Sequence, residues 1–102
     1  QIKPGVPASK IATDYIKFFK DHGFAENYVY GPMHGLGMIE VESPWVETSS
    51  KYVLEPNYTY QVDTFVLGED FGLRWEEGIV ITEDGYELLA PTPIGKIYEL
   101  GF

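Results

Sequence analysis

The first periodic segment of the chain covers residues 9–22, where apolar side chains recur at the spacing of an α-helix. These apolar residues share one helical face and are Ile11, Ala12, Tyr15, Ile16 and Phe19. Ser9 stands where a side chain caps a helix N-terminus, and Gly23 stands where a left-handed residue ends one. We therefore predict an amphipathic helix whose apolar face packs on a sheet.

Alternating apolar and polar positions dominate the second half of the chain. Residues 58–67, 72–82 and 86–89 are rich in β-branched and aromatic side chains, and turn-forming residues separate them. Residues 38–42 are a shorter candidate strand, whereas glycines and prolines predict connections at 26–37 and 43–56. The tail, residues 91–102, is expected to be irregular or an edge. Consecutive hairpins without an intervening helix predict an antiparallel sheet and an α+β fold class.

The hairpin around residues 68–71 is expected to bring two carboxylates together. If its centre lies between residues 69 and 70, Asp63 faces Glu76 on the neighbouring strand, with Cβ atoms about 5 Å apart. Like charges at this spacing repel. They must be solvated, protonated, neutralised by Arg74, or bridged by a metal ion. The alternation alone favours solvation or the ion pair with Arg74 over the metal.

Composition and charge narrow the classes of function. The 102 residues suit one domain, and 44% hydrophobic content excludes a disordered chain. The net charge of −9 argues against nucleic-acid binding and against an anionic membrane surface. No apolar stretch is long enough to span a membrane. The lack of cysteine excludes a thiolate zinc site and fits a cytoplasmic protein. A start at Gln1, inside a turn-like segment, predicts a fragment of a longer protein.

His34 is the histidine that draws attention, because it lies in the glycine-rich stretch Met33-His34-Gly35-Leu36-Gly37. A lone histidine in such a turn is more often incidental than a metal ligand. The residues around it leave both readings open.

Six short motifs follow one another at the spacing of a known superfamily. Starting at residues 33, 41, 54, 62, 72 and 80, they are MHGLGM, VESP, LEP, VD, GLRWEE and VITEDG. The chain resembles the C-terminal half of a pita-bread metallopeptidase catalytic domain, as in Xaa-Pro aminopeptidase, prolidase, methionine aminopeptidase and creatinase. The opening IKPGV at residues 2–6 is similar too. Residues 1–102 are therefore expected to form a single C-terminal subdomain, half of a pita-bread fold.

The resemblance implies a site for two metal ions, to which this chain contributes three ligands. His34 matches the ligand histidine of the family motif GHGIG, Asp63 falls where the family has its first glutamate, and Glu76 matches the last one. Arg74 matches the arginine beside that glutamate and would support a ligand carboxylate. Two divalent ions, Mn, Co or Zn, would ionise a water for attack on a peptide carbonyl.

Several positions depart from the family pattern. Val41 stands where the family has a histidine that contacts substrate, and Tyr30 stands where peptidase branches often have another. Asp63 is one methylene shorter than glutamate, and Thr64-Phe65 replaces the family's Pro-Gly. The two upstream aspartate ligands are absent from this chain. The isolated fragment is therefore expected to be inactive.

We predict that the full-length protein is a cytoplasmic Xaa-Pro dipeptidase- or aminopeptidase-like metallohydrolase acting on a peptide or small-molecule substrate. The N-terminal half of the same domain would complete its site, and a homodimer is left open. The alternative is a catalytically degenerate pita-bread domain that binds a peptide or protein, which Val41 and Tyr30 motivate. A creatinase-like or lyase branch with a non-peptide substrate is the third reading.

Overall fold

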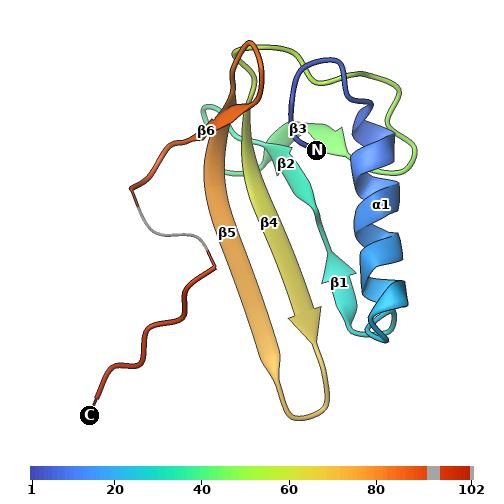
Figure 1. Ribbon diagram of the computed structural model, residues 1–102, viewed down its shortest axis with the longest axis vertical. Helices are drawn as coiled ribbons and strands as arrows, with labels where there is room; N and C mark the ends of the chain where they lie inside the picture. The colour runs from blue at the N-terminus through green and yellow to red at the C-terminus, as the bar shows by residue number, and fades with distance from the viewer. Residues whose placement is uncertain (92–94, 102) are drawn as a thin grey trace.

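One α-helix lies along one side of an antiparallel sheet in this protein (Figure 1). The computed structural model describes residues 1–91 and 95–101. The helix α1 covers Ala8–Asp21. The strands are β1 (Tyr28–Tyr30), β2 (Met33–Gly35), β3 (Glu42–Val46), β4 (Thr59–Leu67), β5 (Gly72–Ile81) and β6 (Tyr86–Leu88). The predicted α+β class is therefore confirmed. The predicted irregular tail, residues 91–102, falls in part on residues 92–94 and 102, outside the described part.

The long hairpin of β4 and β5 forms the centre of the sheet (Figure 1). The strand order is β3-β2-β4-β5-β6, and β1 also pairs with β4. Strand β4 therefore has two partners on the same side. Residues 60–62 pair with β2, and residues 65–66 pair with β1. The pairing changes between them, at Asp63 and Thr64.

The helix begins one residue earlier than predicted, and its start differs from the expected one. Pro7 is the N-cap and no side chain caps the helix, so the predicted cap at Ser9 is wrong. The N–H of Ala8 instead donates to Tyr52 O at 3.0 Å, so the chain before β4 supplies an acceptor. The other end is as predicted, because Gly23 has φ +81° just beyond the helix.

The first strands of the sheet were placed wrongly by the sequence pattern. Residues 38–42 were expected to form a strand, but the chain bends there and Met38 is 99% exposed. Strands β2 and β3 instead lie in segments predicted to be connections. Strand β2 has only three residues, and it forms because it is paired on both sides, with β3 and with β4. Three residues are too few to show the alternation of apolar and polar positions by which a strand is recognised in a sequence.

The hydrophobic core lies between α1 and the sheet. Its buried members are Ala8, Ile11, Ala12, Met33, Val46, Leu54, Tyr60, Ile79 and Ile81. The helix contributes only its first two turns to this set, so the packed end of α1 lies near β3 and the far end is more exposed. Within the described residues, no helix is long and apolar enough to cross a membrane.

Candidate functional site

The predicted register of the central hairpin is confirmed. Asp63 pairs with Glu76, and both side chains share one face of the sheet with Arg74. The Arg74 guanidinium contacts both carboxylates, through Nε to Glu76 Oε1 and through Nη2 to Asp63 Oδ2 at 3.4 Å. Gln61 Nε2 donates to the second oxygen of Glu76 at 3.3 Å. Arg74 therefore offsets part of the repulsion between the two carboxylates, which was one of the arrangements expected from the sequence.

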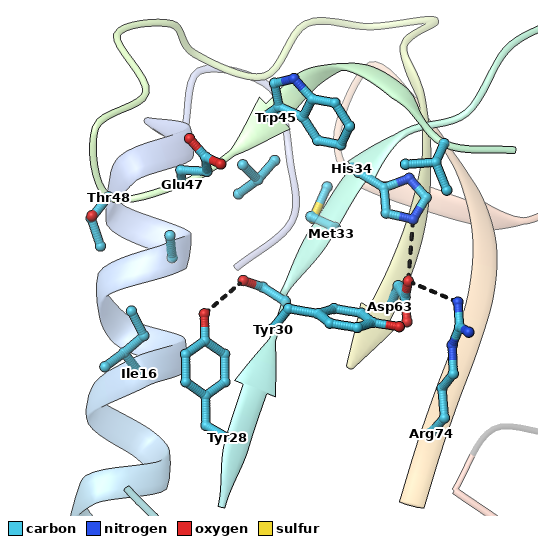
Figure 2. Close-up of a pocket in the computed structure, with 14 residues that line it drawn as sticks. Ile16, Tyr28, Tyr30, Met33, His34, Trp45, Glu47, Thr48, Asp63 and Arg74 are labelled. Atoms are coloured by element: carbon cyan, nitrogen blue, oxygen red, sulfur yellow. Dashed lines mark hydrogen bonds and ion pairs between the residues drawn. The ribbon is translucent and has the colours of Figure 1, made fainter. Parts of the chain in front are cut away.

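His34 reaches the same carboxylate from β2. Its Nε2 lies 3.3 Å from Asp63 Oδ2, and both side chains are buried, at 9% and 3% exposure (Figure 2). Its Nδ1 lies 3.0 Å from Gly35 O. A carbonyl oxygen only accepts, so Nδ1 carries a proton and donates there. Nε2 then faces a carboxylate oxygen, and two arrangements satisfy this contact. A protonated imidazole donates to Asp63 Oδ2, whereas a neutral one needs a cation shared between its nitrogen and the carboxylate.

The other oxygen of Asp63 favours the shared cation. Asp63 Oδ1 is buried and has no hydrogen-bond partner within the described part of the chain. Leaving a buried acceptor unpaired costs about 1–3 kcal/mol, and more for a charged group. Imidazole nitrogen and carboxylate oxygen are ligands that Mn²⁺, Co²⁺ and Zn²⁺ accept, so the donor chemistry fits the predicted metal. Residues 1–91 and 95–101 hold no group of three or more His, Cys, Asp or Glu side chains that could hold a metal ion.

A cavity of about 460 Å³ opens beside this pair. Five of the six predicted site residues line it, namely Tyr30, His34, Val41, Asp63 and Arg74. Glu76 is not among its lining residues. Figure 2 shows the polar group of His34, Asp63 and Arg74 at one end, with Ile16, Glu47 and Thr48 towards the helix at the other. The cavity thus runs from the charged group on the sheet to the side of the helix, and the aromatic side chains of Tyr28, Tyr30 and Trp45 also line it.

Aromatic rings flank the polar end of the cavity. The guanidinium of Arg74 lies 5.8 Å from the centre of the Tyr30 ring, so Tyr30 helps to hold it. Burial raises the pKa of the Tyr30 hydroxyl, and the charge of Asp63 adds to the rise. The sequence reasoning missed Trp45, which pairs with His34 in register and stays 46% exposed at the cavity. Its position directly after the VESP motif, as a large aromatic residue, is the feature of the sequence that could have indicated it.

The stability of the protein without added metal is expected to fall as the pH rises through the pKa of Glu76. Burial raises that pKa above its ordinary value of 4.5, the charge of Asp63 raises it further, and Arg74 opposes the rise. A carboxyl with a raised pKa in the folded state stabilises the fold below its unfolded value and loses that contribution as the pH rises through its folded value.

Glu76→Gln cannot ionise, so its free energy of unfolding should exceed that of the wild type at neutral pH by less than about 1 kcal/mol. Urea unfolding of both proteins across the acid to neutral range measures the difference. Parallel pH profiles for the two proteins would contradict the assignment.

Comparisons with known proteins agree on one family. The family model of metallopeptidase family M24 (Peptidase_M24) matches residues 1–83. The uncharacterized peptidase YqhT of Bacillus subtilis is 33% identical over 96 residues, which is 90% of this chain and 26% of that protein. The Xaa-Pro dipeptidase of Lactobacillus delbrueckii subsp. lactis is 30% identical over 86 residues, or 83% of this chain and 23% of that protein.

Solved structures confirm the fold. The dipeptidase PepE from Mycobacterium ulcerans superposes with a TM-score of 0.82 at 25% identity, over 90% of this chain and 25% of that one. The prolidase from Pyrococcus horikoshii gives 0.85 at 24% identity, over 95% and 28%, and so supports the fold alone. The antiparallel sheet with one packed helix is thus part of a pita-bread fold.

The chain spans about a quarter of the length of the relatives that it matches. The match to the family model nevertheless covers more than half of this chain and includes His34, Asp63, Arg74 and Glu76. This chain therefore belongs to metallopeptidase family M24.

Proposed function

We propose that the full-length protein is an Xaa-Pro dipeptidase- or aminopeptidase-like metallohydrolase, to whose site this chain contributes His34, Asp63 and Glu76. One observation carries the proposal. His34 Nε2 lies 3.3 Å from Asp63 Oδ2, beside a second Asp63 oxygen that is buried and has no partner in the described part of the chain. The relative named Xaa-Pro dipeptidase supports the substrate class. Two divalent ions bound there would supply an ionised water for attack on a peptide carbonyl.

The chain's own residues would prepare this site in three ways. The bond from His34 Nδ1–H to Gly35 O fixes the ring orientation and leaves Nε2 free to bind a cation. Arg74 contacts both carboxylates, which favours their ionised forms. Trp45 and Tyr30 provide apolar surface beside the polar end of the cavity, where they could contact a substrate and exclude water.

The remaining ligands would come from the N-terminal half of the same domain. A chain that spans about a quarter of its relatives, and whose described residues hold no group of three or more suitable metal-binding side chains, supports this division. We accordingly expect the isolated chain to be inactive. We also propose that the full-length protein is cytoplasmic and that it forms a homodimer.

A second function is favoured by a specific observation. Val41 lines the cavity with a side chain that cannot donate a hydrogen bond, and Arg74 already supplies a positive charge to Asp63 and Glu76. A domain built in this way could bind a peptide or protein in the cavity without hydrolysing it. A creatinase-like or lyase activity on a non-peptide substrate would keep the metal and change the reaction.

Titration of Mn²⁺, Co²⁺ and Zn²⁺ into the full-length protein, combined with hydrolysis of Xaa-Pro dipeptides and tripeptides, tests the proposal. We expect metal binding and metal-dependent turnover, both strongly reduced in Glu76→Gln. Residues that only orient a metal ligand typically contribute roughly 10- to 100-fold to metal affinity or activity. Removal of a ligand itself should reduce metal affinity and turnover by at least as much.

Glu77→Gln is the matched control, because it removes the same charge from the next residue, whose side chain points to the other face of β5. Equal turnover in the two variants would count against Glu76 as a ligand. Peptide binding without metal binding would favour the degenerate domain, and metal binding without peptide turnover would favour the non-peptide branch.

A further inference from the structure

The hydroxyl of Tyr15, on α1, reaches the backbone directly behind Asp63. It forms a hydrogen bond with Thr64 Oγ1, and it donates to Tyr30 O at 3.4 Å. A carbonyl oxygen only accepts, so Tyr15 gives its proton to Tyr30 O and accepts from the Thr64 hydroxyl. One chain of hydrogen bonds therefore runs from β4 through the helix to β1.

This contact lies where the sheet is least regular. On one side, Asp63 pairs regularly with Glu76 of β5. On the other side, β4 changes partner from β2 to β1, and the register of β1 shifts between Tyr28 and Tyr30. The N–H of Asp63 donates there to Pro32 O at 2.9 Å, outside the regular ladders. On the side of β4 that faces β1 and β2, the regular strand pairing is therefore interrupted at Asp63. The hydrogen bond between Tyr15 and Thr64 holds the backbone at the next residue.

Gly31 shows how closely the three segments approach. A Cβ atom at this position would lie 2.8 Å from Asp63 O and 2.8 Å from the Tyr15 hydroxyl oxygen. Helix, β4 and the β1–β2 connection therefore meet at one point, behind the sheet face that carries the carboxylate. Gly31 lies between the Tyr15 hydroxyl and Asp63 O, so we expect a displacement of Tyr15 to reach the Asp63 backbone through this close packing.

The Tyr15 ring is itself held in place. It packs edge to face on Phe19 and Tyr28, with ring centres 4.9 Å and 5.7 Å away. Burial raises the pKa of its hydroxyl, so the group stays protonated and able to donate across the physiological range. Aromatic packing fixes where the hydroxyl lies, and its protonation fixes what it can do there.

We propose that Tyr15, acting through Thr64, is a positioning residue that holds the Asp63 carboxylate at its distance from His34 Nε2. The inference rests on the proposed function, in which Asp63 and His34 bind a metal ion. Metal ligands need placement to within about 0.5 Å. The contact between Tyr15 and Thr64, which fixes the backbone next to Asp63, is therefore expected to affect the affinity of the site for its metal ion. Loss of groups that orient a ligand typically costs about 10- to 100-fold in metal affinity.

The test uses the full-length protein and two readouts, one with metal and one without. Tyr15→Phe removes only the hydroxyl. It should weaken Co²⁺ binding by about 10- to 100-fold, change the visible absorption of bound Co²⁺, and speed amide hydrogen exchange at Asp63 in the metal-free protein. Thr64→Val should do the same, whereas Thr64→Ser keeps the hydroxyl and should restore wild-type values.

Thr13→Val is the matched control, since its hydroxyl also donates to a backbone carbonyl, Ser9 O at 2.7 Å, on an exposed part of the same helix and away from Asp63. It should leave all three readouts unchanged. Wild-type Co²⁺ affinity, spectrum and Asp63 exchange in Tyr15→Phe would overturn the inference. If the wild type binds no Co²⁺, the proposed function fails, and amide exchange at Asp63 alone decides this inference. If Tyr15→Phe does not fold, the Thr64→Val and Thr64→Ser pair decides it.

Discussion

Asp63→Asn is expected to reduce metal-dependent turnover of the full-length protein by at least about 100-fold, the upper end of the loss seen for residues that only orient a ligand. Asparagine has nearly the same shape, but it lacks the charge that would bind a cation. The asparagine side-chain oxygen can still accept from Arg74 in the place of Asp63 Oδ2, but a neutral amide oxygen attracts a divalent cation less than a carboxylate does. Titration of Mn²⁺ against turnover measures the loss.

Stability should move in the opposite direction from activity. Asp63 is buried, one of its oxygens has no partner among the described residues, and Glu76 stands opposite it in register. The substitution removes this repulsion. The ion pair that it also removes is with Arg74, whose side chain is half exposed and keeps its contact with Glu76. Without metal, the variant should therefore unfold at the same or a higher urea concentration. Asp70→Asn, at the exposed tip of the hairpin, is the control for loss of one charge. Equal turnover in the two variants would rule out a ligand role for Asp63.

The central hairpin could be predicted residue by residue because local chemistry determines it. The turn around residues 68–71 sets the centre, and the two-residue period then fixes every pair, including Asp63 opposite Glu76. The helix was predictable for a similar reason, since fourteen residues contain enough turns for a periodic pattern to show. Both elements carry their information within a continuous stretch of sequence.

The contact between His34 and Asp63 could not be predicted from such local patterns. It depends on β2 pairing with β4 across 29 residues of chain, and β2 itself has three residues. The family resemblance indicated both residues as ligands, but the glycines around His34 predicted only a connection there. Trp45 was missed for the same reason, because its place opposite His34 comes from the irregular pairing of β2 with β3.

The cap of the helix shows a second limit of local reasoning. Ser9 has a good capping side chain, yet the helix begins before it, because Tyr52 O accepts from Ala8 N–H. A tertiary acceptor took the role that a local side chain usually fills. The partner of β4 likewise changes at Asp63, where one buried carboxylate oxygen has no partner among the described residues. Local rules are expected to fail first at such places, where tertiary contacts decide the structure.

Gly31→Ala is expected to lower the free energy of unfolding by at least about 3 kcal/mol, the sum of backbone strain and overpacking. Gly31 has φ +130°, which side-chain-bearing residues rarely adopt, and its new Cβ would lie 2.8 Å from both Asp63 O and the Tyr15 hydroxyl oxygen. Gly23→Ala is the matched control. Gly23 also has positive φ, +81°, but a Cβ there meets no atom within 4 Å. That variant should lose only about 1 kcal/mol, the conformational part alone. Urea unfolding of both variants measures the difference, and equal losses would mean that α1 and β4 do not meet at Gly31 as closely as described.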